Sequence, residues 1–174
     1  GEENTIYWEA SFESVRYPVA VDPTLSFVAR STTSGGAVIT GETGAGHFGA
    51  AITTGDFNAD GRTDLAVGAE NYSSDTGRVY IFYNDGNITT TAGLADVIIT
   101  GETTSNLFGG GYMTSGDFNA DGKTDLVVSA QTYSTSTGRV YIFYNDGSIP
   151  TTAGSADVTI TGETTTNSFG RFMG

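Results

Sequence analysis

An acidic stretch of nine residues occurs twice in the chain, 61 residues apart. The first copy runs from Asp56 to Asp64 (DFNADGRTD), and the second runs from Asp117 to Asp125 (DFNADGKTD). Each copy places side-chain oxygens at positions 1, 3, 5 and 9 and a glycine at position 6. A hard cation such as calcium binds about six to eight oxygens, so this spacing predicts a calcium loop.

Both loops offer the same ligand set, namely four side chains and the backbone carbonyl at position 7. The predicted ligands are Asp56, Asn58, Asp60, Arg62 and Asp64 in the first loop and Asp117, Asn119, Asp121, Lys123 and Asp125 in the second. An EF-hand would need a bidentate acid at position 12, where the chain has Val67 and Val128. The simpler alternative is a polar hairpin turn without metal. We favour two calcium sites, since three carboxylates within nine residues repel one another unless they are neutralised.

The role that we predict for this calcium is structural. A catalytic metal needs an open coordination position and acid–base groups beside it, and no histidine or other base recurs next to the loops. The single histidine, His47, is replaced by Leu107 and Ser168 in the equivalent positions, so we interpret it as a surface residue. No pair of carboxylates is positioned for glycoside hydrolysis. We therefore predict that the protein is not an enzyme.

Composition excludes several other classes of function. The formal net charge is −13 with only seven lysines and arginines, which argues against nucleic acid and against an anionic membrane surface. There is no cysteine, so disulfides and thiolate metal sites are absent. No apolar run is long enough for insertion into a membrane.

Most of the chain is an internal repeat of about 60 residues. ITGET occurs at residues 39–43, 99–103 and 160–164, and GRVYIFYNDG occurs at 77–86 and 138–147. Each unit reads as four short strands: one after a Phe-Gly pair, then, in the first unit, 65–69, 78–83 and 95–100. No long helical pattern occurs. We predict an all-β fold of four-stranded antiparallel blades, as in a β-propeller.

The repeat divides the chain into four segments. Residues 1–36 form a divergent N-terminal β segment, 37–100 the first repeat, 101–161 the second, and 162–174 the start of a truncated third. Propellers need about four to eight blades, so we expect an incomplete ring. The alternating residues 6–12 could pair with the open end of another copy, which would give a head-to-tail oligomer or filament.

The Phe-Gly pairs, the acidic loops and the following DLAVGA segment (64–69) resemble FG-GAP repeats. FG-GAP repeats form the propeller blades of integrin α-subunits and occur in bacterial surface proteins. The second unit departs from the first by having Ser129 in place of Gly68. The resemblance implies a calcium-binding adhesive or structural protein, extracellular or at the cell surface. The expected partners of this chain are copies of itself, and possible further partners are extracellular proteins or glycans.

Some features keep alternatives open. The chain could be a fragment of a larger propeller that serves as a ligand-binding receptor head or as an accessory domain of a secreted enzyme. Aromatic residues of the third strands could stack on sugars, but their apolar run favours a core between blades. Asn71 and Asn87 match the N-glycosylation pattern, and threonine-rich loops could carry O-glycans.

Overall fold

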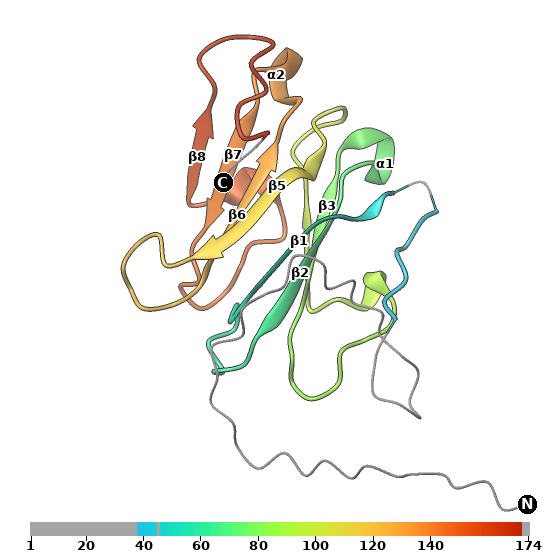
Figure 1. The fold of residues 1–174 in the computed structure, drawn as a ribbon, viewed down its shortest axis with the longest axis vertical. Coiled ribbons are helices and arrows are strands. Elements are labelled where there is room, and N and C mark those ends of the chain that lie inside the picture. Colours follow the sequence, from blue (N-terminus) through green and yellow to red (C-terminus); the bar gives the residue numbers. More distant parts are fainter. Residues whose placement is uncertain (1–37, 45, 172–174) are drawn as a thin grey trace, which may run out of the picture.

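The computed structural model describes residues 38–44 and 46–171 as two antiparallel sheets of four strands each (Figure 1). The first sheet contains β1 (Phe48–Gly55), β2 (Asp64–Ala69), β3 (Arg78–Phe82) and β4 (Val97–Thr100), side by side in that order. The second contains β5 (Phe108–Gly116), β6 (Asp125–Ala130), β7 (Arg139–Phe143) and β8 (Val158–Thr161). The predicted all-β class and the four-stranded blades are confirmed, and the described residues form no closed ring. Residues 1–37 and 172–174, including the predicted exchange arm 6–12, lie outside the described residues.

The second and third strands of each sheet carry most of its buried residues, and the apolar sequence of the third strands predicts their burial. Val79 to Phe82 of β3 are all buried, and Tyr80 lies opposite Val67 of β2. The predicted fourth strand was too long by two residues. Ala95 instead ends a short 3-10 turn, because its N–H donates to the carbonyl oxygen of Ala92 at 3.0 Å.

Among residues 38–44 and 46–171, the helical segments are single turns. They are α1 (Tyr72–Asp75), η1 (Ala92–Leu94), α2 (Tyr133–Ser136) and η2 (Ala153–Ser155). Ser73 and Ser74 have positive φ angles of 50° and 57°, so α1 is a connecting turn rather than a regular helix. In the described part of the chain, no helix has the length and apolar character needed to cross a membrane.

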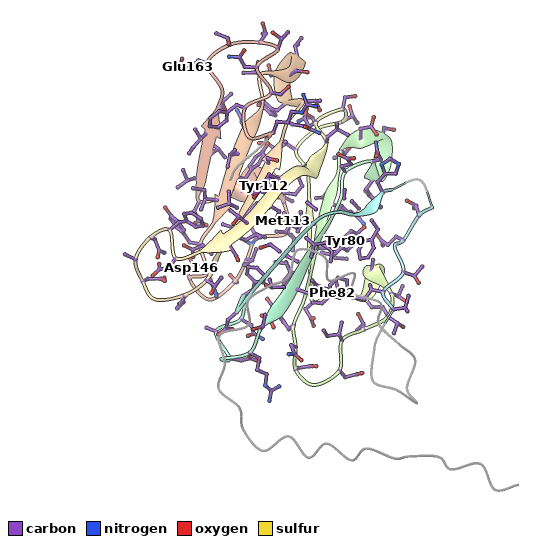
Figure 2. All side chains as sticks on the ribbon, viewed as in Figure 1. Tyr80, Phe82, Tyr112, Met113, Asp146 and Glu163 are labelled. Atoms are coloured by element: carbon purple, nitrogen blue, oxygen red, sulfur yellow. The ribbon has the colours of Figure 1, made fainter. Side chains whose placement is uncertain are left out.

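The two sheets pack against each other like neighbouring blades (Figure 1). A shared core contains Phe57, Val79, Ile81 and Ile99 from the first unit and Phe108, Met113, Leu126, Val128, Tyr141 and Phe143 from the second. Figure 2 shows Tyr80 and Phe82 on the first sheet, with Tyr112 and Met113 on the neighbouring strand β5. The third-strand aromatics Tyr80, Phe82, Tyr141 and Phe143 are buried as predicted, while Tyr83 and Tyr144 are half-buried. The predicted core between blades contains Tyr141 and Phe143, whereas Tyr80 and Phe82 belong to a separate core within the first unit.

Hydroxyl groups also join the sheets beside this core. The Thr53 hydroxyl lies 3.4 Å from the hydroxyl oxygen of Ser115, and Ser115 donates to the backbone carbonyl of Thr54 at 2.6 Å. These bonds connect β1 directly to β5, so the second acidic loop starts from a strand that is anchored on the first sheet.

Candidate metal centre

The two acidic loops occupy equivalent places in the two sheets. Residues 56–63 connect β1 with β2, and residues 117–124 connect β5 with β6. The ninth position is already part of the sheet, because Asp64 begins β2 and Asp125 begins β6. Asp64 and Asp125 are buried, whereas the third and fifth positions are exposed. The predicted placement of both loops between the first two strands is confirmed.

The side chains of the first loop turn inward onto its own backbone. The Asp56 carboxylate accepts the N–H groups of Asp60 at 3.0 Å and Gly61 at 2.9 Å. The amide oxygen of Asn58 also accepts the Asp60 N–H, at 3.0 Å. Asp60 in turn accepts the N–H of Arg62 at 2.8 Å. Oxygens from positions 1, 3 and 5 are therefore gathered around one tight turn.

Backbone conformation explains the glycine at the sixth position. Gly61 has a φ of +84°, and Gly122 has the same value. No atom lies within 4 Å of the place that a Cβ on Gly61 would occupy. The glycine is therefore required by the left-handed backbone and not by crowding.

Asp64 fastens the loop to the sheet. One of its carboxylate oxygens accepts the N–H of Phe57, and the other accepts the N–H of Asn84, both at 2.8 Å. Burial raises the pKa of the Asp64 carboxyl, the two backbone hydrogen bonds lower it, and the charges of Asp60 and Asp56 raise it again. Negative charges that repel one another at this place would be relieved by a cation.

The second loop repeats the six hydrogen bonds from backbone N–H groups to side-chain oxygens that the first loop makes. Asp117 accepts the N–H groups of Asp121 at 3.0 Å and Gly122 at 2.9 Å, and Asn119 accepts that of Asp121 at 2.9 Å. Asp121 accepts the Lys123 N–H at 2.9 Å. Asp125 accepts the N–H groups of Phe118 at 2.8 Å and Asn145 at 2.9 Å. Two loops that fold alike indicate that this arrangement follows from the nine-residue sequence.

The donor atoms suit a hard cation, because every predicted ligand offers oxygen and none offers sulfur or imidazole. Within the described residues, however, no three aspartate, glutamate, histidine or cysteine side chains converge as a metal cluster. The carboxylates instead bind the amides of their own loops. The chemistry of the donor set fits calcium, and the ten ligands stay a prediction, including the carbonyl groups of Arg62 and Lys123.

A network that the sequence analysis missed lies at the opposite end of each sheet. Glu42 accepts hydrogen bonds from Arg78 at 2.8 Å and from the Tyr80 hydroxyl at 2.7 Å. The Arg78 guanidinium also stacks 3.8 Å above the Tyr72 ring. Burial and then the Glu42 carboxylate raise the pKa of Tyr80, while Arg78 lowers it.

The second unit repeats this network. Glu102 binds Arg139 and the Tyr141 hydroxyl, both at 2.9 Å, and Arg139 lies 3.8 Å above the ring of Tyr133. The sequence signal for these networks was the repetition of both ITGE and GRVY, because each network joins one copy of the first motif to one copy of the second.

Three other residues singled out by their sequence lie outside the acidic loops, namely His47, Asn71 and Asn87. His47 is exposed, and its Nδ1 lies 3.6 Å from a carboxylate oxygen of Glu70. Asn71 is half-buried, and its side-chain nitrogen donates to Asp75 at 2.6 Å, whereas Asn87 is exposed. Of the two glycosylation candidates, only Asn87 thus presents an exposed side chain.

The FG-GAP repeat family model matches residues 48–82 and 113–143. Those matches begin at β1 and within β5 and end at β3 and β7, so each includes one acidic loop. The two units are FG-GAP repeats. Their four-stranded sheets are the blades that the resemblance implied.

Similarity to individual proteins extends over about half of the chain. It is 40% identical to integrin alpha-M of Mus musculus over 89 residues, which are 49% of this chain and 8% of that protein. Identity to integrin alpha-IIb of Homo sapiens is 34% over 98 residues, or 52% of this chain and 9% of the relative. Phosphatidylinositol-glycan-specific phospholipase D of Rattus norvegicus is 35% identical over 99 residues, which are 53% of this chain and 11% of that protein. The aligned parts thus span about a tenth of these relatives.

Proposed function

We propose that this protein is a non-catalytic, calcium-stabilised structural or adhesive FG-GAP module that stacks blade on blade outside the cell. The observation that carries the proposal is the pair of acidic loops, in which the same six hydrogen bonds join backbone N–H groups to the same carboxylate and amide positions in both repeats. A polar turn needs no such set of carboxylates, since a single asparagine or aspartate can stabilise a turn. Three carboxylates kept in each loop are explained by a cation that they share.

Calcium would act as a clamp between the first two strands of each blade. Asp56 and Asp60 belong to the connecting loop, whereas Asp64 belongs to β2 and bonds to Asn84 beyond β3. A cation held by all three would tie the loop to the sheet. Calcium in the concentration range of extracellular fluids suits modules of modest affinity, which supports a location outside the cell.

Exposed apolar residues support the stacking part of the proposal. Phe57 is 1% exposed because the second blade covers it, while its repeat counterpart Phe118 is 48% exposed. Ile99 is likewise buried and its counterpart Ile160 exposed. The outer face of the second blade is therefore the same kind of surface that the second blade covers on the first.

The first blade offers the complementary surface. Met113 is buried between the two blades at 6% exposure, whereas its counterpart Ile52 is 50% exposed. We infer that a second copy docks its first blade on the outer face of the second blade, head to tail. The linkers 39–48 and 160–169 are equivalent, so one of them must move aside in such a contact.

Similarity to the phospholipase D supports a second candidate, an accessory region of a secreted enzyme. A region of that kind would share the calcium clamps but would need no contact between copies. The assembly state therefore separates the two candidates.

Thermal unfolding in calcium and in excess chelator tests the proposal. We expect the chelator to lower the midpoint by several degrees. Asp60→Asn and Asp121→Asn should each remove part of that difference, because each removes one charge from one loop. Asp146→Asn is the control, since Asp146 is an exposed aspartate outside both loops (Figure 2). A midpoint unaffected by chelator would overturn the calcium part.

A further inference from the structure

Asn145 connects the second blade to the first acidic loop. It is the second residue after β7 and is 3% exposed. Its side-chain nitrogen donates to the backbone carbonyl of Asp56 at 3.2 Å, across 89 positions of the sequence. Its backbone N–H donates to Asp125 at 2.9 Å. One buried residue therefore touches both loops.

The two contacts fall on the first position of one loop and the last position of the other. Asp125 also accepts the N–H of Phe118, which is the second residue of its own loop. A continuous series of hydrogen bonds thus leads from Phe118 through Asp125 and Asn145 to Asp56. Asp125 is thus connected to Asp56, where the first loop begins, through the two hydrogen bonds of Asn145.

The repeat provides an internal comparison. Asn84 is the counterpart of Asn145, and its backbone N–H makes the same bond to Asp64, at 2.8 Å. Asn84 is only half-buried, and its side chain has no hydrogen bond within the described residues. The backbone bond is therefore a feature of each blade, while the side-chain bond depends on a preceding loop. This difference indicates that the side chain of Asn145 serves the contact with the first blade, and is not simply a buried amide that has found a hydrogen-bond partner.

We propose that Asn145 is a positioning residue that couples the two acidic loops, so that calcium in the second loop raises the calcium affinity of the first. The inference rests on the calcium binding proposed above. An ion bound by Asp125 would hold that carboxylate still, and Asn145 would transmit the restraint to Asp56. By reciprocity, calcium in the first loop raises the affinity of the second by the same factor.

A calorimetric calcium titration of the full chain tests this coupling. Asp121→Asn weakens the second loop directly, and we expect it to lower the affinity of the first loop by about fivefold, the size of one neutral hydrogen bond. In an Asn145→Ala background, Asp121→Asn should change the calcium affinity of the first loop by less than about twofold. Asn145→Leu, which keeps the side-chain volume, should behave as Asn145→Ala does. Such a double-mutant cycle isolates the link between the loops.

The control is Asn84→Ala, which keeps the backbone N–H that bonds to Asp64 and should leave the coupling unchanged. If Asp121→Asn alters only its own site in the otherwise unchanged chain, the coupling is wrong although calcium binds. This result requires no substitution at Asn145, so it stands even where those variants fail to fold. If the unsubstituted chain shows no binding of calcium, the calcium proposal and the coupling both fall.

Discussion

Gly68 of the first blade lies directly against the backbone carbonyl of Gly109 in the second blade. A Cβ atom on Gly68 would overlap the Gly109 oxygen, so no other residue fits while the two blades stay together. Ser129, the repeat counterpart of Gly68, is buried in the second blade, and its hydroxyl accepts the N–H of Tyr112 at 2.8 Å. The first repeat thus has glycine where the second has serine because the backbone of the neighbouring blade lies directly against Gly68.

Gly68→Ser should destabilise the protein by about 3 kcal/mol, because the new side chain forces the blades apart. Denaturant unfolding measures this loss as a lower midpoint. Ser129→Gly is the matched control. We expect it to lower the free energy of unfolding by about 1 kcal/mol, because it loses one hydrogen bond and makes the unfolded backbone more flexible. Equal losses for the two variants would contradict the close packing inferred at Gly68.

Glu102→Gln should lower the free energy of unfolding by about 1 kcal/mol, because the variant keeps the shape of the side chain but removes its charge from Arg139 and Tyr141. Glu163 is the third copy of the same motif, at the outer end of the second blade (Figure 2). It has no hydrogen bond or ion pair within the described residues, so Glu163→Gln should change stability by less than about 0.5 kcal/mol. A loss at Glu163 as large as that at Glu102 would show that the network is not the cause.

Alkaline pH should weaken the fold through its buried tyrosines. Burial, followed by the neighbouring glutamates, raises the pKa of Tyr80 and Tyr141 in the folded state. Their contribution to stability is complete below the ordinary tyrosine pKa of about 10 and falls as the pH rises above it, because the unfolded chain ionises first. Tyrosinate absorbance should therefore appear in two stages, the later one together with unfolding. A single stage near the ordinary pKa in the folded protein would contradict the raised values.

Contact between copies can be trapped by disulfides, because the chain has no cysteine of its own. Thr114 and Thr54 are the repeat counterparts of Thr53 and Ser115, whose hydroxyl oxygens lie 3.4 Å apart between the blades. If copies stack as the blades do, Thr54→Cys/Thr114→Cys should form a ladder of cross-linked oligomers on a non-reducing gel.

Thr53→Cys/Ser115→Cys is the control for this experiment, since it should close a disulfide within one chain. A closed control beside purely monomeric Thr54→Cys/Thr114→Cys would rule out head-to-tail stacking.

The internal repeat and the turn residues between its strands were enough to predict the blades. Alternating and apolar runs bounded by glycine, asparagine and aspartate located the strands to within about two residues, since these signals are local. The acidic loops were found for the same reason: Asp56 to Asp64 and Asp117 to Asp125 are contiguous in sequence.

Contacts between distant parts of the chain could not be predicted in this way. The bond from Asn145 to Asp56 depends on how one sheet packs on the other, and no local pattern encodes that angle. The Glu42–Arg78 pair joins two motifs whose repetition was visible but whose distance in space was not. The positive φ angles of Ser73 and Ser74 also run against the ordinary preference of serine.

Direct calcium titration of the full chain by calorimetry tests the central claim most simply. The account predicts two calcium ions bound per chain, with one lost on weakening either loop by Asp60→Asn or Asp121→Asn. Absence of calcium binding at millimolar concentration would contradict it.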